Sequence, residues 1–310
     1  MNALRARPWL MTLGVLVILC IISVILQPNF FSARIVKSNL TTFLPLVLVA
    51  IGQCYVVLGG DIDLSVGSIV ALVNVVTVSV IAAFGGEGAI FIGMAAGMAT
   101  GLVAGLFNGV MIAALRLQPI VTTFATGIIF AAIAIWILPT AGLPVPASYW
   151  RSYGASVFGV PVVGLIMIAA LVWAVVFARS RFHGHLLAVG GNRTGAFQSG
   201  LAVAALRIKA YGLSGIFAAL AALCLTGETA SGDPLLGQSL ALSSISAVVL
   251  GGTALAGGAG TALGALIGAL VLGLIGNVIF FAGLPFEYQT LVQGLIVLAA
   301  LAGGVFVTRR

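Results

Sequence analysis

The sequence predicts an all-α, polytopic integral membrane protein with about ten transmembrane helices. Its composition is 62% hydrophobic and only 6% charged, whereas soluble domains are nearer half apolar and about a quarter charged. The apolar residues form long continuous runs, not the alternating strands of outer-membrane barrels. Each run approaches the roughly 20 residues that a helix needs to cross about 30 Å of hydrocarbon.

The expected spans follow these apolar runs in order and make one transmembrane domain over residues 1–310. The first run follows Arg5 and Arg7 and lacks a small-residue cleavage site, so we interpret it as a span and not as a signal peptide. Glycine, proline or charged residues separate the later runs. The expected spans are 9–26, 40–58, 69–84, 89–115, 120–138, 160–178, 210–226, 240–256, 261–281 and 289–307.

The basic residues predict the orientation. Ten spans put both termini on one side, and we expect that side to be the cytoplasm because positive charge gathers there. The outside set is then Arg34, Lys37 and Arg151. The inside set is Arg5, Arg7, Arg116, Arg179, Arg181, Arg193, Arg207, Lys209, Arg309 and Arg310. In a membrane protein a net charge of +7 reflects this asymmetry more than an affinity for nucleic acid.

One polar stretch, residues 179–209, interrupts the apolar pattern on the expected cytoplasmic side. It contains five basic residues, both histidines and no acid. We expect a short helix over 196–199, started by a cap at Asn192 or Thr194 and ended by Gly200. With one aromatic residue and a basic flank, this helix would fit a groove in a soluble partner. Alternatively, the loop only sets topology and touches anionic membrane lipid.

Glycines recur every four residues in two of the expected spans. Such rows form a groove in which helix backbones pack closely. They indicate either tight static packing or a helix that slides against its neighbour. The rows are Gly93, Gly97, Gly101, Gly105 and Gly109 in one span, and Gly260, Gly264 and Gly268 in the other.

Asp61 and Asp63 are the only acids expected near the inner side. A carboxylate at mid-membrane costs about 2.5–3.5 kcal/mol on insertion scales. Asp63 or Ser65 would avoid that cost by capping the helix that follows, where backbone N–H groups and the helix dipole favour negative charge. The other interpretation is that the acids line a wet pathway and bind a cation, a proton or substrate hydroxyls.

Several kinds of site are not predicted. His183 and His185 have no nearby Cys, Asp or Glu to complete a metal site. The serines, histidines and aspartates are too scattered for a hydrolytic triad. The chain has no G-x-x-x-x-G-K-[ST] phosphate loop, so ATP-driven work would need another polypeptide.

Polar residues inside the spans are few, and some must bond neighbouring helices. A subset facing one cavity would suit a neutral, hydroxyl-rich solute better than an ion. Our candidates for a substrate pathway are Asp61, Asp63, Ser65, Asn74, Asn108, Thr122, Thr123 and Asn277.

Three stretches resemble the inner-membrane permease subunits of ABC importers for ribose and related monosaccharides, in the branched-chain amino acid and monosaccharide permease family. Residues 59–68, GGDIDLSVGS, resemble the signature G-I-D-L-S-V-G-S, with Asp61 where the family usually has glycine. Residues 190–200 are similar to the cytoplasmic loop G-G-N-x-x-A-A-R-x-S-G. Residues 247–258, AVVLGGTALAGG, resemble A-V-V-L-G-G-x-S-L-x-G-G. The likeness extends over essentially the whole chain.

The resemblance implies a bacterial inner-membrane permease that is not itself an enzyme. It would pair with a second permease copy, as a homodimer or heterodimer, above two ATPase subunits that hold ATP and Mg²⁺ and below a periplasmic sugar-binding protein. Loops 139–159 and 227–238 are the expected docking surface for the binding protein. The residues expected to contact the ATPase are Gly190, Gly191, Asn192, Arg193, Thr194, Ala196, Phe197, Ser199, Gly200 and Leu201.

Two departures from the family pattern concern this contact. The family often has an acid at or before the position of Thr194, and arginine at the position of Phe197. We therefore expect an apolar contact to replace a charged one. Two alternative functions remain from the sequence: an ion-coupled secondary transporter that uses Asp61 and Asp63, and a passive channel.

Overall fold

The computed structural model describes residues 9–285, 287–288, 290–292, 294–295 and 298. Within them, seven helices are long and apolar enough to cross a membrane. These are α2 (Trp9–Leu26), α3 (Ala33–Leu58), α4 (Val66–Phe84), α5 (Ala89–Ala113), α6 (Pro119–Ile137), α11 (Val203–Thr229) and α13 (Ala262–Phe281). The chain is thus a multi-pass, all-α membrane protein, as its composition predicts.

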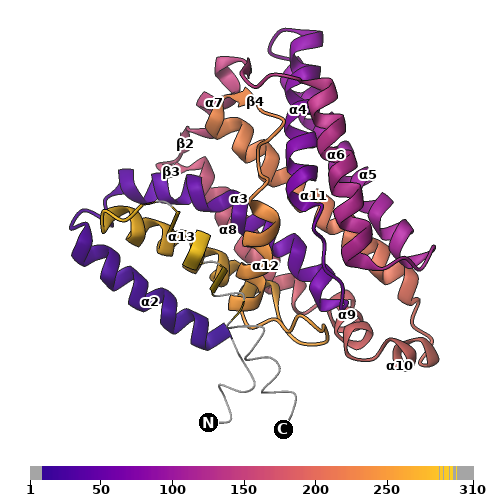
Figure 1. Cartoon of the computed structure of the whole chain (residues 1–310). Helices are drawn as coiled ribbons and strands as arrows, with labels where there is room; N and C mark the ends of the chain where they lie inside the picture. The colour runs from indigo at the N-terminus through magenta and orange to yellow at the C-terminus, as the bar shows by residue number, and fades with distance from the viewer. Residues whose placement is uncertain (1–8, 286, 289, 293, 296–297, 299–310) are drawn as a thin grey trace.

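The shorter elements lie at the ends of these helices and beside them. Helix α8 (Val162–Phe177) continues into α9 (Arg181–Gly191) through a bend of 68°, and counting this pair as one span gives up to eight. The others are α7 (Ala147–Tyr153), α10 (Arg193–Gln198), α12 (Leu240–Leu250), β1 (Leu143–Pro144), β2 (Ser156–Val157), β3 (Val160–Pro161) and β4 (Ser231–Gly232). Helices α9 and α10 lie at the opposite end of the molecule from α7 and β4 (Figure 1).

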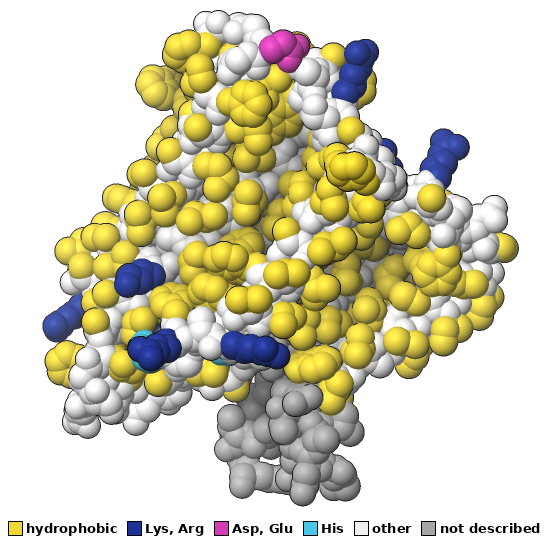
Figure 2. Space-filling model, turned by 180° about the vertical axis from the view of Figure 1, so that it is seen from behind, with side chains coloured by type: hydrophobic (Ala, Val, Ile, Leu, Met, Phe, Trp, Pro, Cys, Tyr) yellow, Lys and Arg dark blue, Asp and Glu magenta, His cyan; other side chains and the backbone are white. Residues whose placement is uncertain are grey.

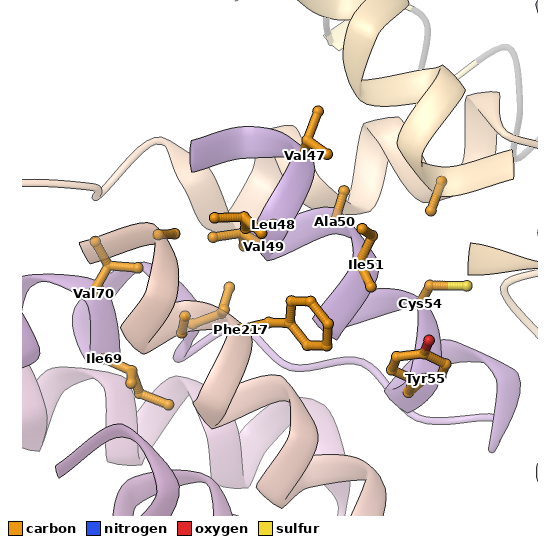
Figure 3. Close-up of a cluster of buried hydrophobic side chains, with 14 of the residues drawn as sticks. Val47, Leu48, Val49, Ala50, Ile51, Cys54, Tyr55, Ile69, Val70 and Phe217 are labelled. Carbon is orange, nitrogen blue, oxygen red and sulfur yellow. The ribbon is translucent and has the colours of Figure 1, made fainter. Parts of the chain in front are cut away.

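Helix α3 is the centre of the core. It packs against α11, α13, α12 and α8, and every residue from Phe43 to Leu58 except Leu46 is buried. A helix that is apolar on all sides is stable only when neighbours surround it. Figure 3 shows part of this core, in which the Phe217 ring from α11 lies among side chains of α3.

The outer faces of α5, α6 and α8 expose large apolar side chains, including Phe91, Val103, Phe124, Trp136 and Ile168. In the view of Figure 2, hydrophobic side chains cover the middle of the molecule, and the charged ones lie toward its two ends. This is the surface that a lipid-embedded protein requires.

The two glycine rows form the close packing that their spacing predicts. A Cβ on Gly105 would lie 2.3 Å from the carbonyl oxygen of Tyr211 on α11. On α13, a Cβ on Gly268 would lie 2.0 Å from the carbonyl oxygen of Ala247 on α12. Backbone packs directly on backbone at both interfaces. A sliding role for these helices stays a prediction.

The expected span 240–256 is wrong as a continuous helix. Helix α12 has 11 residues, which reach about 16 Å, roughly half the thickness of the hydrocarbon. The residues before it, 231–239, run antiparallel to α4 without forming a helix. At one end Asn74 of α4 bonds the backbone of Ser231 and Asp233, and at the other Gly237 lies against Val70.

Non-helical backbone at membrane depth is tolerated only where protein surrounds it and satisfies its polar groups. The Asn74 amide does this here: its Nδ2 donates to the Ser231 carbonyl at 3.3 Å, and its Oδ1 accepts from the Asp233 N–H at 2.8 Å. Eight of the other expected spans correspond to helices, with ends shifted by up to seven residues. The last, 289–307, lies largely outside the described residues.

Candidate coupling site

The predicted short helix in the polar stretch is present as α10. Asn192 caps it, because its Oδ1 accepts the Gly195 N–H at 2.9 Å. The Asn192 N–H donates to the Ala188 carbonyl, the last such hydrogen bond of α9. Of the two caps considered, Asn192 is therefore correct and Thr194 is not. Ala196 is buried, whereas the Phe197 side chain is 71% exposed.

Glycines end the helices in all three stretches that carry the family resemblance. Gly60, Gly200 and Gly252 follow α3, α10 and α12 with φ of 78°, 82° and 81°. After each, the next N–H bonds the carbonyl five residues back, at 3.2, 3.1 and 3.2 Å. This is the Schellman motif, which needs a left-handed residue. The motif glycines therefore stop the three helices at defined residues.

The same three stretches meet at one place, the glycine junction. It consists of the pairs Gly59-Gly60, Gly190-Gly191 and Gly257-Gly258. The N–H of Gly258 donates to the Leu58 carbonyl at 3.1 Å. A Cβ on Gly190 would lie 2.0 Å from that carbonyl oxygen, and one on Gly257 would lie 2.7 Å from the Cα of Gly60. Side chains would hold these backbones apart, so glycine is required for the contact.

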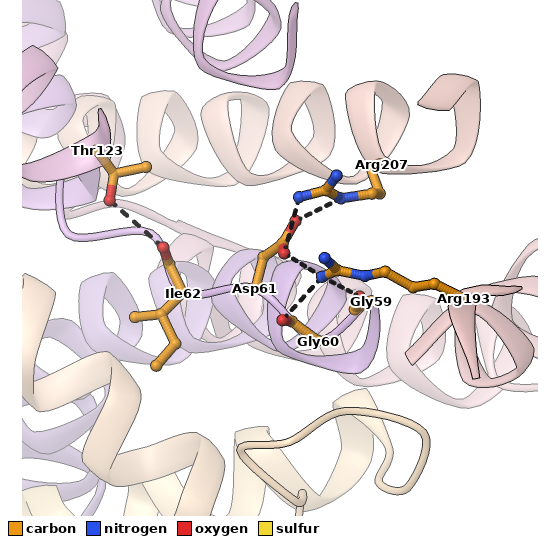
Figure 4. A network of polar contacts seen from close by, with 7 residues as sticks. All are labelled: Gly59, Gly60, Asp61, Ile62, Thr123, Arg193 and Arg207. Atoms are coloured by element: carbon orange, nitrogen blue, oxygen red, sulfur yellow. Dashed lines mark hydrogen bonds and ion pairs between the residues drawn. The ribbon is translucent and has the colours of Figure 1, made fainter. Parts of the chain in front are cut away.

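Asp61 joins the junction to α10. Its Oδ1 accepts from Arg193 at 2.5 Å, and its two oxygens accept from Arg207 at 2.8 and 3.0 Å. Arg193 also donates to the carbonyls of Gly59 and Gly60, at 3.3 and 3.0 Å (Figure 4). Arg193 is the first residue of α10 and Arg207 lies near the start of α11. The negative charge of Asp61, at a position where the family usually has glycine, is thus neutralised by two arginines.

Asp63 lies two residues further on and has no cationic partner among the described residues. Its carboxylate accepts from the N–H and Oγ of Ser65, at 2.9 and 2.6 Å, and from the Ser214 hydroxyl at 3.4 Å. Asn108 donates to the Ser65 hydroxyl at 2.7 Å. These four residues form the Asp63 cluster, and all four are buried. Its members come from the loop before α4 and from α5 and α11.

The loop that carries Asp63 lies between the spans α3 and α4. The buried surroundings of Asp63 disfavour the charged form of its carboxyl. Burial raises the pKa of the Asp63 carboxyl, and the hydrogen bonds from Ser65 and Ser214 oppose that rise. The capping prediction is only partly right. Ser65 holds the N-cap position of α4, but its side chain bonds no helix N–H, and Asp63 accepts the N–H of Ser65 itself.

The eight predicted pathway residues do not gather in one place. Asp63, Ser65 and Asn108 belong to the Asp63 cluster. Thr123 contacts the same loop, accepting from the Leu64 N–H at 3.0 Å and donating to the Ile62 carbonyl at 3.3 Å. Asp61 lies at the glycine junction.

The other three predicted residues lie elsewhere. Asn74 bonds the 231–239 segment, Thr122 bonds its own helix at Gln118, and Asn277 donates to Asn39 at 2.9 Å. Sequence reasoning missed Ser214, whose signal is a serine in a mainly apolar run. No group of three or more potential metal ligands occurs in the described part of the chain.

Comparison with known proteins identifies the class of this protein. Residues 35–301 match the family described as branched-chain amino acid transport system / permease component. The match covers most of the chain, and the chain belongs to that family.

Curated relatives are similar along nearly their whole length. The chain is 35% identical to the ribose import permease protein RbsC of Bacillus subtilis, over 93% of this chain and 90% of that protein. It is 32% identical to RbsC of Escherichia coli K12, over 95% and 94%. It is 30% identical to the D-allose transport system permease protein AlsC of Escherichia coli, over 89% and 83%. No solved structure matches the chain.

Proposed function

We propose that this chain is the transmembrane subunit of an ABC importer that moves a monosaccharide, a pentose or hexose of the ribose type, into the bacterial cytoplasm. Family membership and the names of the relatives, which include ribose, allose and arabinose permeases, support the substrate class. The single observation that carries the mechanism is the meeting of three distant stretches at the glycine junction, beside a short helix with an exposed aromatic residue.

In the proposed cycle the protein alternates between two states that open to opposite sides of the inner membrane. Both termini lie in the cytoplasm and the chain crosses ten times. A second copy of this chain or a related chain completes the pathway. Two ATPase subunits, which carry the ATP and Mg²⁺, receive α10, and Phe197 fills an apolar groove in one of them. The rest of the α10 surface sets the orientation of this helix in the ATPase groove.

A periplasmic sugar-binding protein docks at the other end, on loops 139–159 and 227–238. Strands β1 and β4 support this, because they pair Leu143 with Gly232 and Pro144 with Ser231 and so join the two loops. Beyond β4 the rest of the second loop runs along α4, from Asp233 beside Asn74 to Gly237 beside Val70. Force applied at the loops thus has a direct path to Asn74 and α12.

The test is uptake by vesicles that contain this chain, its co-encoded ATPase and its binding protein. Radiolabelled ribose and hexoses should enter only when ATP is enclosed with the ATPase. Uptake by vesicles with this chain alone, driven by a proton or sodium gradient, would instead establish a secondary transporter. The ion pairs of Asp61 already oppose that alternative, since both its oxygens are occupied by arginines.

A further inference from the structure

We propose that Asp61 is the positioning residue that ties α10, the helix proposed to contact the ATPase, to the membrane-spanning part of the protein. Through Arg193 and Arg207 it passes movement of α10 to the loop before α4 and to α11. This inference rests on the proposed function, and it assigns a role to a residue that departs from the family pattern.

The first argument is connectivity. Among the described residues, Arg193 makes the only side-chain hydrogen bonds that join α10 to another helix or loop. The side chains of Asn192 and Ser199 bond Gly195 within the helix itself. The other contacts of α10 are packing contacts, such as that of the buried Ala196. A displacement of α10 therefore reaches the α3–α4 loop most directly through Arg193 and Asp61.

The second argument is the geometry of the three charges. Asp61 lies between Arg193 and Arg207, which approach its carboxylate from different elements (Figure 4). Arg193 also grips the carbonyls at the end of α3, where the helix dipole favours a cation. Arg193 thus links α10 to the end of α3, and the Asp61 carboxylate links Arg193 to Arg207 at the start of α11.

The third argument is burial. The side chain of Asp61 is 2% exposed and that of Arg207 is 11% exposed, whereas that of Arg193 is 43% exposed. Ion pairs with little water around them are screened less than surface pairs, and removing one partner leaves an uncompensated charge. The Asp61–Arg207 pair is therefore a fixed anchor, and Arg193 is its movable end.

The fourth argument is where the anchor leads. Asp61 is two residues from Asp63 in the same loop. Thr123 of α6 bonds the backbone of this loop at Ile62 and at Leu64. The Asp63 cluster then reaches α5 and α11 through Asn108 and Ser214. A shift of Asp61 therefore acts on the polar groups of four spanning helices, α4, α5, α6 and α11.

The test compares ATP hydrolysis with sugar uptake in the reconstituted permease–ATPase–binding-protein complex. Asp61→Asn keeps the size of the side chain and removes its charge. Because the apolar contact at Phe197 is untouched, the ATPase should remain bound and hydrolyse ATP within about twofold of wild type. Sugar moved per ATP should fall about fivefold or more, the lower end of typical coupling effects. Arg181→Gln, at an exposed arginine of α9 on the same loop, should change neither quantity.

A double variant separates linkage from folding. Asp61→Asn leaves Arg207 without a counter-charge, so the melting temperature of this variant should fall below that of wild type. Asp61→Asn with Arg207→Gln removes both buried charges and should recover most of that stability, yet its uptake per ATP should stay low. Recovery of uptake along with stability would show that Asp61 acts only by stabilising the fold, and would overturn the proposal.

A third measurement needs no partner. In the purified full-length chain, trypsin cleaves after Arg193 only when that side chain is released. Asp61→Asn should speed this cleavage about fivefold relative to cleavage after Arg181 in the same molecule, since proteolysis follows the population of the open form. An unchanged ratio would refute the link. If wild-type vesicles show no ATP-driven uptake, the proposed transport function fails, and this cleavage ratio still decides whether Asp61 holds α10.

Discussion

Asp61 and Asp63 are two residues apart, yet the protein stabilises them in opposite ways. Asp61, at the glycine junction, is held by two guanidinium groups. Asp63 is surrounded by hydroxyls and an amide, with no cation among the described residues. The first arrangement fixes a charge and joins separate elements. The second leaves a carboxyl whose charged form is disfavoured. The difference teaches that one short motif serves two purposes. Asp61 links separate elements through ion pairs, and Asp63 places a titratable carboxyl in a buried polar cluster.

The largest effect should come from breaking the junction itself. Gly190→Ala places a methyl group 2.0 Å from the Leu58 carbonyl oxygen. The clash is with backbone, so the loss should exceed the ~1–3 kcal/mol usual for overpacking. We expect little monodisperse protein after purification. Gly184→Ala is the matched control on the same helix, because nothing lies within 4 Å of its Cβ position. Equal yields of the two variants would contradict the backbone contact.

Removal of the exposed aromatic residue should have the next largest effect. Phe197→Ala should weaken ATPase binding by ~2 kcal/mol, about 30-fold, as expected for an aromatic anchor. Folding should not change, since the side chain is 71% exposed. Titration of the purified chain with its ATPase measures the affinity. Phe158→Ala serves as the control, because Phe158 is a fully exposed aromatic residue in the turn between β2 and β3. Wild-type affinity in the Phe197 variant would exclude a plug role.

The Asp63 cluster predicts that the stability of the protein depends on pH. Because burial raises the pKa of Asp63, its contribution to stability is complete below the ordinary carboxyl pKa of about 3.9 and is lost as pH rises through the raised value. Asp63→Asn removes this loss. The melting temperature of the variant relative to wild type should therefore rise from pH 5 to pH 8, by an amount typical of ~1 kcal/mol. A growing advantage of wild type over that range would mean that the carboxylate is stabilised in its charged form.

Uptake by the same variant tests a separate point. If Asp63 only holds the start of α4, the amide should support most of the transport, since asparagine also accepts backbone N–H bonds. Complete loss of uptake in a correctly inserted protein would instead support a direct role of the carboxyl in the pathway.

The smallest effect should come from Ser214. Its hydroxyl donates to Asp63 at 3.4 Å, a long hydrogen bond, so Ser214→Ala should cost ~0.5 kcal/mol at the low end of such interactions. Thermal unfolding at pH 5 and pH 8 should show the loss mainly at the higher pH, where the carboxylate needs the donor. An equal loss at pH 5 and pH 8, or the same loss when Ser214→Ala is made in the Asp63→Asn background, would show that Ser214 acts outside this cluster.

Much of the fold could be predicted from the sequence because lipid imposes simple rules. The run 9–26 coincides with α2, and the short helix with its asparagine cap is present as α10. Local chemistry decides both features: a long apolar run in one case, a cap and a terminating glycine in the other.

The remaining features depend on residues far apart in the sequence. The 231–239 segment reads as an outer loop because the sequence does not show that Asn74 bonds its backbone. The pairs of Asp61 join residues separated by 132 and 146 positions, so no local pattern predicts them. Asn277 resembles Asn108 in the sequence, yet it bonds Asn39 of α3 and not the Asp63 cluster.

Photo-crosslinking at position 197 tests the central claim most directly. A photoreactive phenylalanine analogue replaces Phe197 in membranes that also contain the co-encoded ATPase, and the same analogue replaces Phe158 in a parallel sample. The coupling role of α10 predicts a crosslink to the ATPase from position 197 and none from position 158. Labelling of lipid alone from position 197, in membranes that still import sugar with ATP, would contradict it.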